Sequence, residues 1–198
     1  LIKVSISVAQ IDTAFWFAAP WVTPDHDGNT PIVFRIATFG NATAVRVRQI
    51  AGTYDTTINI AANGLYSHDV SWVVNTVETK PANSVLPYGF KISSDFPITV
   101  VYEVVSNANF NPETISLKGQ NGLGTEFVCP FQNKWDIGIF NPVNPFAQIN
   151  IVASQAATTI WITPRCNVVG HPANTSYSIT LNQGESYTVQ NMIEEESS

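Results

Sequence analysis

Apolar and polar residues alternate along most of this chain with the period of two that is typical of β-strands. Val, Ile and Thr are enriched in the alternating segments, and Gly, Asn, Asp and Pro cluster between them. The segments with the clearest alternation are residues 3–8, 33–38, 44–50, 56–61, 89–94, 97–105, 147–154, 158–163 and 176–181. For residues 66–85, which lack a helical stripe, the sequence predicts short strands leading into a loop. The pattern predicts an all-β fold of antiparallel β-sandwich type.

The chain also repeats itself. Three pairs of segments match in the same order: residues 12–20 with 124–130, 34–47 with 149–162, and 57–66 with 178–187. Any two β-segments can be slid into phase, but three matches in one order favour a duplication. We therefore predict two tandem, sequence-related β-sandwich-like units, residues 1–114 and 115–198. The second unit has no counterpart of residues 89–105, so we expect it to be incomplete at its C-terminus.

Composition narrows the classes of function. Of the 198 residues, 44% are hydrophobic and 12% are charged, and the net charge is −6. An acidic chain cannot neutralise a phosphate backbone, so we expect no nucleic-acid partner. The sequence has no run of eighteen apolar residues, so no membrane span is expected. A low charge content with many Thr, Asn and Ser residues is typical of extracellular or cell-surface β-proteins.

Two groups of residues raise the question of a metal or a disulfide. Asp25, Asp27 and Asn29 alternate in a short Gly-containing loop, as in the first half of a calcium loop. The bidentate acid that an EF-hand needs is absent, and the same residues also form ordinary turns. We predict no other cofactor. Cys129 and Cys166 are either one disulfide or two unbonded side chains, a question that geometry decides.

The sequence predicts no enzyme. Ser67, His68 and Asp69 carry the residue types of a hydrolase triad, but neighbours on a strand point to opposite faces. Nucleophile-elbow, Walker and Rossmann glycine motifs are all absent from the sequence. The catalytic set is therefore expected to be empty.

Tryptophans offer a binding role instead. Trp21 and Trp135 follow the equivalent strands of the two predicted units, in segments expected to be loops. An exposed indole can stack on a sugar ring, which is how β-sandwich carbohydrate-binding modules hold their ligands. The alternative is that these rings pack against the protein.

The motifs also carry a family resemblance. The order runs from "TAFWFAAP" through "GFKISSDFPITVVYEV", "SLKGQNGLGTEFVCPFQ" and "INIVASQAATTIWITP" to "YSITLNQGESYTV". This order resembles the N-terminal domain of the IgGFc-binding protein family, which also occurs in surface and secreted proteins of Bacteroidetes-like bacteria. The resemblance implies an extracellular β-rich module without known catalytic residues.

We expect a non-catalytic extracellular adhesion or structural module that binds a protein or glycan partner. A carbohydrate-binding module using Trp21 and Trp135 is the first alternative. A self-assembling surface filament is the second, because the alternating residues 1–10, "LIKVSISVAQ", can pair with a neighbouring copy.

Overall fold

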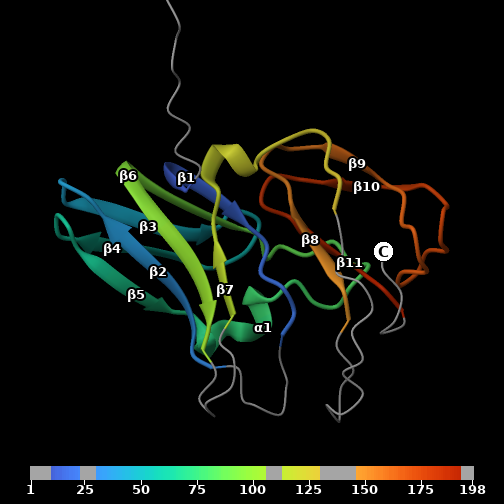
Figure 1. Ribbon diagram of the computed structural model, residues 1–198, viewed down its shortest axis with the longest axis horizontal. Helices are drawn as coiled ribbons and strands as arrows, with labels where there is room; N and C mark the ends of the chain where they lie inside the picture. Colours follow the sequence, from blue (N-terminus) through green and yellow to red (C-terminus); the bar gives the residue numbers. More distant parts are fainter. Residues whose placement is uncertain (1–9, 23–29, 106–112, 130–145, 193–198) are drawn as a thin grey trace, which may run out of the picture.

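A computed structural model describes residues 10–22, 30–105, 113–129 and 146–192. The prediction of an all-β fold with antiparallel sheets is confirmed. The described strands are β1 (Ile11–Phe17), β2 (Ile32–Thr38), β3 (Thr43–Gln49), β4 (Asp55–Ile60), β5 (Leu65–Asp69), β6 (Phe90–Val104), β7 (Glu113–Ser116), β8 (Gln148–Val152), β9 (Thr158–Ile162), β10 (Tyr177–Leu181) and β11 (Ser186–Gln190). Figure 1 shows the larger sheet, with β1 to β7, on the left and β8 to β11 on the right.

The larger sheet is organised around β6. Its strand order is β4-β3-β6-β2-β5, and β1 and β7 pair with β6 as well. The first part of β6 pairs with β3 and β1, whereas its second part pairs mainly with β2 and β7. The exposed residues Asp95, Phe96 and Pro97 lie between the two parts. The segments 89–94 and 97–105, predicted as two strands, thus form one strand that serves both halves of a curled sheet.

The apolar side chains on one face of the alternating strands form the core of this sheet. Phe34, Phe90 and Tyr102 are fully buried. The ring centroid of Phe34 lies 5.3 Å from that of Phe90 and 5.5 Å from that of Tyr102. Phe15 packs in the same cluster. Burial of aromatic rings of this size contributes a large share of the stability of such a core.

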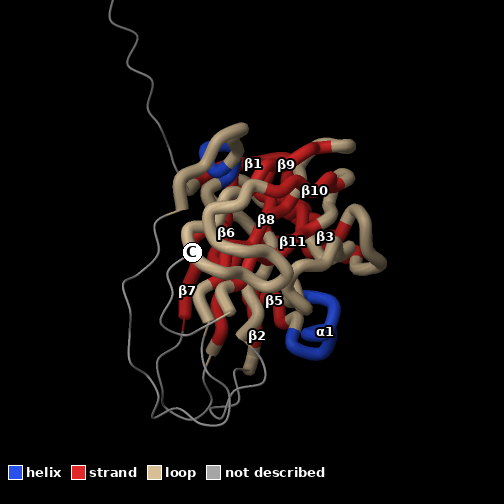
Figure 2. The backbone as a smooth tube through the Cα atoms, turned by 90° about the vertical axis from the view of Figure 1, so that its right-hand side faces the viewer, coloured by secondary structure: helices blue, strands red, loops and turns tan. Residues whose placement is uncertain are grey.

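The remaining strands form two small antiparallel sheets, β8 with β11 and β9 with β10. Their apolar side chains face a second, smaller core that includes Cys166, Leu181, Tyr187 and Val189. In Figure 2 these four strands face the viewer.

The pairing of β8 to β11 has the same pattern as that of β2 to β5. The first strand of each set pairs with the fourth, and the second pairs with the third. The registers also coincide at the positions matched by the sequence repeat. Ile36 pairs with Tyr66 as Ile151 pairs with Tyr187, and Thr43 pairs with Ile60 as Thr158 pairs with Leu181.

This agreement supports the duplication, but the tandem division of the chain remains a prediction. The proposed boundary between residues 114 and 115 falls inside β7, which pairs with β6 of the first set.

Two local predictions were wrong. Val74–Val77 forms one helical turn, α1, after the 3-10 turn Ser71–Val73, where only strands and loop were expected. Residues 123–129, expected to restart the strand pattern as β1 does, have no strand structure. In β1 the corresponding segment is held by β6, and residues 123–129 have no described strand beside them.

A segment that precedes β6 packs against the second set of strands, β8 to β11. Residues 79–89, between α1 and β6, run along the edge of β11 that faces away from β8. The backbone N–H of Leu86 donates to the carbonyl of Ser186 at 2.9 Å, and Ser186 donates back to Leu86 at 2.7 Å. The Tyr187 hydroxyl donates to the side chain of Asn83 at 2.5 Å.

Candidate binding surface

Four partly or fully exposed rings form an aromatic surface at the β5 edge of the larger sheet. We define this aromatic surface as Tyr54, Tyr66, His68 and Trp72. Trp72 is 76% exposed and Tyr66 is 42% exposed. Tyr54 lies at the centre, with its ring centroid 6.1 Å from those of both His68 and Trp72.

The local sequence explains how these rings come together. Tyr66 and His68 are two residues apart on β5, so both point to the same face of the sheet. They pair with Ile36 and Phe34 of β2, whose side chains are buried, so their rings lie at the rim of the core. Trp72 lies in the 3-10 turn Ser71–Val73, which comes shortly after β5.

One hydrogen bond fixes the centre of the surface. The Tyr54 hydroxyl and His68 Nε2 are 2.5 Å apart. Burial lowers the pKa of His68 below its ordinary value, an effect that the Asp69 carboxylate opposes. Burial also raises the pKa of Tyr54, so at neutral pH a protonated hydroxyl meets a neutral imidazole, and the tautomer of the ring decides which of the two donates.

Polar groups lie on the opposite face of β5 and in the turn that follows it. Arg35 contacts Glu103 through its Nε and donates to the Ser67 hydroxyl at 2.6 Å. Asp69 accepts hydrogen bonds from the backbone and the hydroxyl of Ser71. Of these groups, the Asp69–Ser71 pair lies at the turn that carries Trp72, so hydrogen-bonding groups adjoin the rings at that end of the surface.

The backbone edge of β5 is also available. Within the described part of the chain β5 pairs with β2 alone and ends the path of the sheet. Its counterpart β11 pairs with β8 on one edge and with residues 83–86 on the other. Within the described residues, the position that takes up an extended segment in the second set has no partner strand in the first.

Trp21 has neighbours other than these four rings. The Trp21 ring is 36% exposed, and the Lys80 ammonium lies 5.9 Å from its centroid. Its backbone is held by the Gln148 side chain, which accepts from the Trp21 N–H at 3.1 Å and donates to the Trp21 carbonyl at 2.9 Å. Trp135 lies outside the described residues.

The calcium prediction also falls outside the described residues, because Asp25, Asp27 and Asn29 are not among them. Within the described ranges, no group of three or more His, Cys, Asp or Glu side chains could hold a metal ion. The calcium site remains a prediction.

The two cysteines are not joined to each other in the structure. Cys166 is buried in the second core, whereas Cys129 is exposed at the end of residues 123–129. The disulfide itself stays a prediction.

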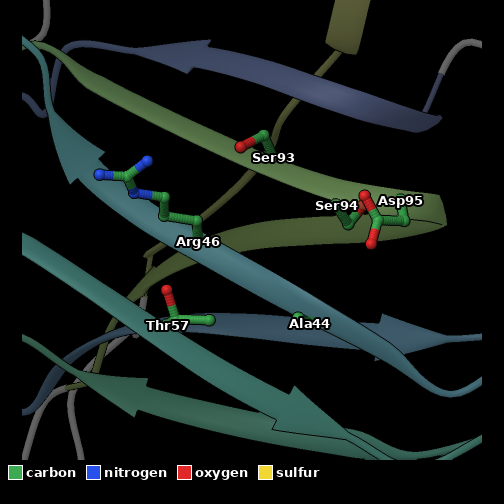
Figure 3. A pocket seen from close by; sticks show the side chains of 6 residues that line it. All are labelled: Ala44, Arg46, Thr57, Ser93, Ser94 and Asp95. Atoms are coloured by element: carbon green, nitrogen blue, oxygen red, sulfur yellow. The ribbon is translucent and has the colours of Figure 1, made fainter.

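A shallow depression on the larger sheet carries no recognisable catalytic set. It has a volume of about 340 Å³ and lies on β3, β4 and β6. Its lining residues are Ala44, Arg46, Thr57, Ser93, Ser94 and Asp95 (Figure 3). The Arg46 guanidinium is engaged by both carboxylate oxygens of Asp55, which lowers the pKa of that carboxyl and raises that of Arg46.

Ser67, His68 and Asp69, the residue types of a hydrolase triad, have partners other than one another. His68 contacts Tyr54, and Asp69 contacts Ser71.

Of the described helices, none is long and apolar enough to cross a membrane.

Comparison with known families adds the following. Residues 112–197 match the family model described as IgGFc binding protein. The resemblance seen in the sequence is confirmed over this part of the chain, which includes β7 to β11. This family is one of non-enzymatic binding domains that are typically extracellular. No curated protein and no solved structure matches the chain.

Sequence reasoning missed the aromatic surface. Tyr66 and Trp72 stand in a segment without clear alternation, and Tyr54 lies in a turn. A signal was present in the spacing of Tyr66 and His68 on one strand. The contact between Tyr54 and both His68 and Trp72 depends on how β4 and β5 are placed by the sheet.

Proposed function

We propose that this protein is a non-catalytic extracellular module that binds a protein partner through the aromatic surface and the adjoining edge of β5. The observation that carries the proposal is the difference between two equivalent tyrosines. Tyr187 on β11 is 2% exposed under a docked segment of the chain, whereas Tyr66 on β5 is 42% exposed.

The docked segment indicates the kind of partner. On β11 the backbone of Leu86 exchanges hydrogen bonds with Ser186, and Asn83 binds the Tyr187 hydroxyl. An open edge with a row of rings beside it offers the same two features to another polypeptide. Main-chain bonds supply affinity in such edge complexes, and side-chain pockets supply specificity.

The rings themselves are suitable anchors. Tyr and Trp are enriched among the residues that carry most of the binding energy of interfaces. Trp72 combines a large area with few rotatable bonds, so little conformational entropy is lost when it is covered.

The test measures binding of the full chain to the Fc fragment of IgG, which the family description suggests, and to a glycan array. Trp72→Ala and Tyr66→Ala are compared with Trp161→Ala, which removes a ring that is equally exposed, at 73%, on β9. We expect the first two variants to weaken Fc binding by about tenfold or more, and Trp161→Ala to leave it unchanged.

Carbohydrate binding is the second candidate, because exposed rings with neighbouring polar groups also suit sugars. Glycan binding that is lost in Trp72→Ala, Trp21→Ala or Trp135→Ala, without Fc binding, would replace the protein-binding proposal. Fc binding that survives both Trp72→Ala and Tyr66→Ala would contradict it.

A further inference from the structure

The outer face of the larger sheet carries a group of basic side chains. Arg46 and Arg48 on β3, and Lys91 on β6, alternate with the buried residues Val47 and Ile92, so they point away from the core. Arg48 lies directly opposite Lys91 in the register of β3 with β6. Three of the nine Lys and Arg residues of a chain with a net charge of −6 thus lie close together on this face.

Only one of these three cations is hydrogen-bonded to an acid among the described residues. Asp55 on β4 engages Arg46 with both carboxylate oxygens, although the register places Asp55 opposite Arg48. For Arg48 and Lys91, the described part of the chain shows no ion pair. Like charges directly opposite each other on a sheet repel, so an anion that lies between the two side chains is favoured.

The Arg48 guanidinium has a donor that is not used. Its Nε is buried, and no group in the structure accepts a hydrogen bond from it. A buried N–H without an acceptor is unfavourable, and such groups are rare in native proteins. An oxyanion that binds the guanidinium would supply it with the acceptor that it lacks, since Arg and carboxylate or sulfate groups match in geometry.

An aromatic ring orders the second cation. Lys91 Nζ lies 5.3 Å from the ring centroid of Trp16, which is its register partner on β1. The face of an indole attracts an ammonium group electrostatically. Trp16 thus holds the ammonium near Arg48 without neutralising its charge, so the pair of cations is formed before any ligand binds.

Hydroxyl groups continue from this pair along the same face. Ser93 follows Lys91 by two residues on β6 and lies opposite Arg46. Together with Thr57 of β4, Ser93 lines the depression of about 340 Å³ (Figure 3). Among its lining residues only Ala44 is apolar. The depression therefore suits a ligand rich in hydroxyl groups better than an apolar side chain.

The two ends of the site differ in charge. Asp95 lines the far end of the depression, four residues beyond Lys91, or about 13 Å along β6. A carboxylate accepts hydrogen bonds from sugar hydroxyls and repels a second acidic group. The site therefore favours a ligand with one acidic group at the Arg48 end and hydroxyls at the other. A peptide with several adjacent acidic side chains fits it less well.

We propose that this face binds an acidic oligosaccharide, at an acidic-sugar site made of Arg48, Lys91, Ser93, Thr57 and Asp95. The carboxylate or sulfate group of one sugar lies between Arg48 and Lys91, and the hydroxyls of the next sugar bind in the depression. The acidic-sugar site lies on β3, β4 and β6, whereas the aromatic surface lies at the edge formed by β5. Binding of the sugar and of the proposed protein partner can therefore fail separately.

The test measures binding of four probes to the full chain by isothermal titration calorimetry. Hyaluronan tetrasaccharide carries carboxylates alone, and chondroitin sulfate tetrasaccharide carries sulfates as well, so the two distinguish the acidic group. Chitotetraose is a neutral sugar of the same length, and tetraglutamate is an acidic peptide. We expect at least one of the acidic sugars to bind about tenfold or more tightly than chitotetraose and tetraglutamate do.

Three variants test the named residues. Arg48→Gln and Lys91→Gln should each weaken binding of the acidic sugar by about tenfold, because each removes a charged donor. Asp95→Asn should also weaken it, although this variant removes a negative charge. A face that merely attracts anions would bind more tightly after Asp95→Asn, so this variant separates the two explanations.

The matched control is Lys118→Gln, which removes the charge of an exposed lysine outside the acidic-sugar site and should leave binding unchanged. Trp72→Ala should leave it unchanged as well, since that ring belongs to the aromatic surface. Circular dichroism and thermal melting check the folding of every variant. If Arg48→Gln does not fold, Lys91→Gln and Asp95→Asn still carry the test, because their side chains lie at the surface.

Four results would overturn the proposal. Neither acidic tetrasaccharide binds more tightly than chitotetraose, or tetraglutamate binds as tightly as the sugars do. A folded Lys91→Gln chain binds the acidic sugar no more weakly than the Lys118→Gln chain does. Finally, Asp95→Asn leaves binding unchanged or makes it tighter.

Discussion

At the residue scale, the same residue type has different surroundings at equivalent positions. Tyr66 and Tyr187 both pair with an isoleucine of the neighbouring strand, Ile36 and Ile151. Tyr187 is covered and donates a hydrogen bond to Asn83, whereas Tyr66 stacks on His68 at the surface. The alternation of the sequence predicts the face to which each ring points. It does not predict what lies over that face.

His68 gives a prediction about pH. Burial holds its pKa below the ordinary value of 6.5, so the folded chain favours the neutral imidazole more than the unfolded chain does. The contribution to stability is therefore complete above pH 6.5 and is lost as the pH falls through the lower pKa of the folded state. We expect NMR titration of the His68 ring to give a pKa below 6.5.

Tyr54→Phe is the matched variant for this prediction, because it removes the hydroxyl that is hydrogen-bonded to His68 Nε2 and keeps the ring. In the tautomer with the proton on Nδ1, the hydroxyl donates to Nε2 of the neutral ring, and loss of this bond should raise the pKa of His68 toward its ordinary value. A folded Tyr54→Phe chain with an unchanged His68 titration would show that the hydrogen bond has no influence on the pKa.

At the element scale, turns fix how the strands meet. Gly184, in the turn between β10 and β11, has φ of +83°, and its N–H donates to the carbonyl of Ala153 at 2.8 Å. Its own carbonyl accepts from the N–H of Gly89 at 3.1 Å. This turn therefore connects the second set to the start of β6.

Gly184→Ala is expected to destabilise the protein by about 2 kcal/mol, because the backbone is left-handed and a Cβ would approach the Cβ of Ile50 to 2.8 Å. Gly40→Ala is the control, since a Cβ at Gly40 meets nothing within 4 Å. Urea denaturation of both variants measures the difference. Equal stabilities would mean that the turn adapts at no cost.

At the scale of the whole molecule, residues 79–89 connect the two strand sets. The Thr188 hydroxyl on β11 is buried and donates to the carbonyl of Thr79 at 2.7 Å. Since Thr79 also donates its N–H to the carbonyl of Ala19 at 3.0 Å, this contact links β11 to the chain after β1. We therefore expect the described parts to unfold together, in one transition.

Thr188→Val keeps the shape of the side chain and leaves the Thr79 carbonyl without this donor. The expected loss of stability is about 1–2 kcal/mol, measured as a lower melting temperature in calorimetry. Thr57→Val, at an exposed position of β4, should change the melting temperature little. Two separate transitions, with only one shifted by Thr188→Val, would contradict the expectation of joint unfolding.

The sequence by itself determined the local structure of the chain. Period-two alternation identified segments that became β2, β3, β4, β8, β9 and β10, because a strand with one buried face must alternate. The repeat predicted which positions correspond, and Ile36 with Tyr66 and Ile151 with Tyr187 have the same register. The family resemblance was likewise carried by short motifs and is confirmed over residues 112–197.

Only the tertiary structure decided what covers each strand. Phe15 and Phe127 correspond in the repeat, but β6 lies beside one and no described strand lies beside the other. The aromatic surface likewise depends on contacts between Tyr54 and a strand that follows it in the chain. Alternation is a property of neighbouring residues, whereas burial and open edges depend on which distant segments are present to pack, and this is why the candidate sites emerged only from the fold.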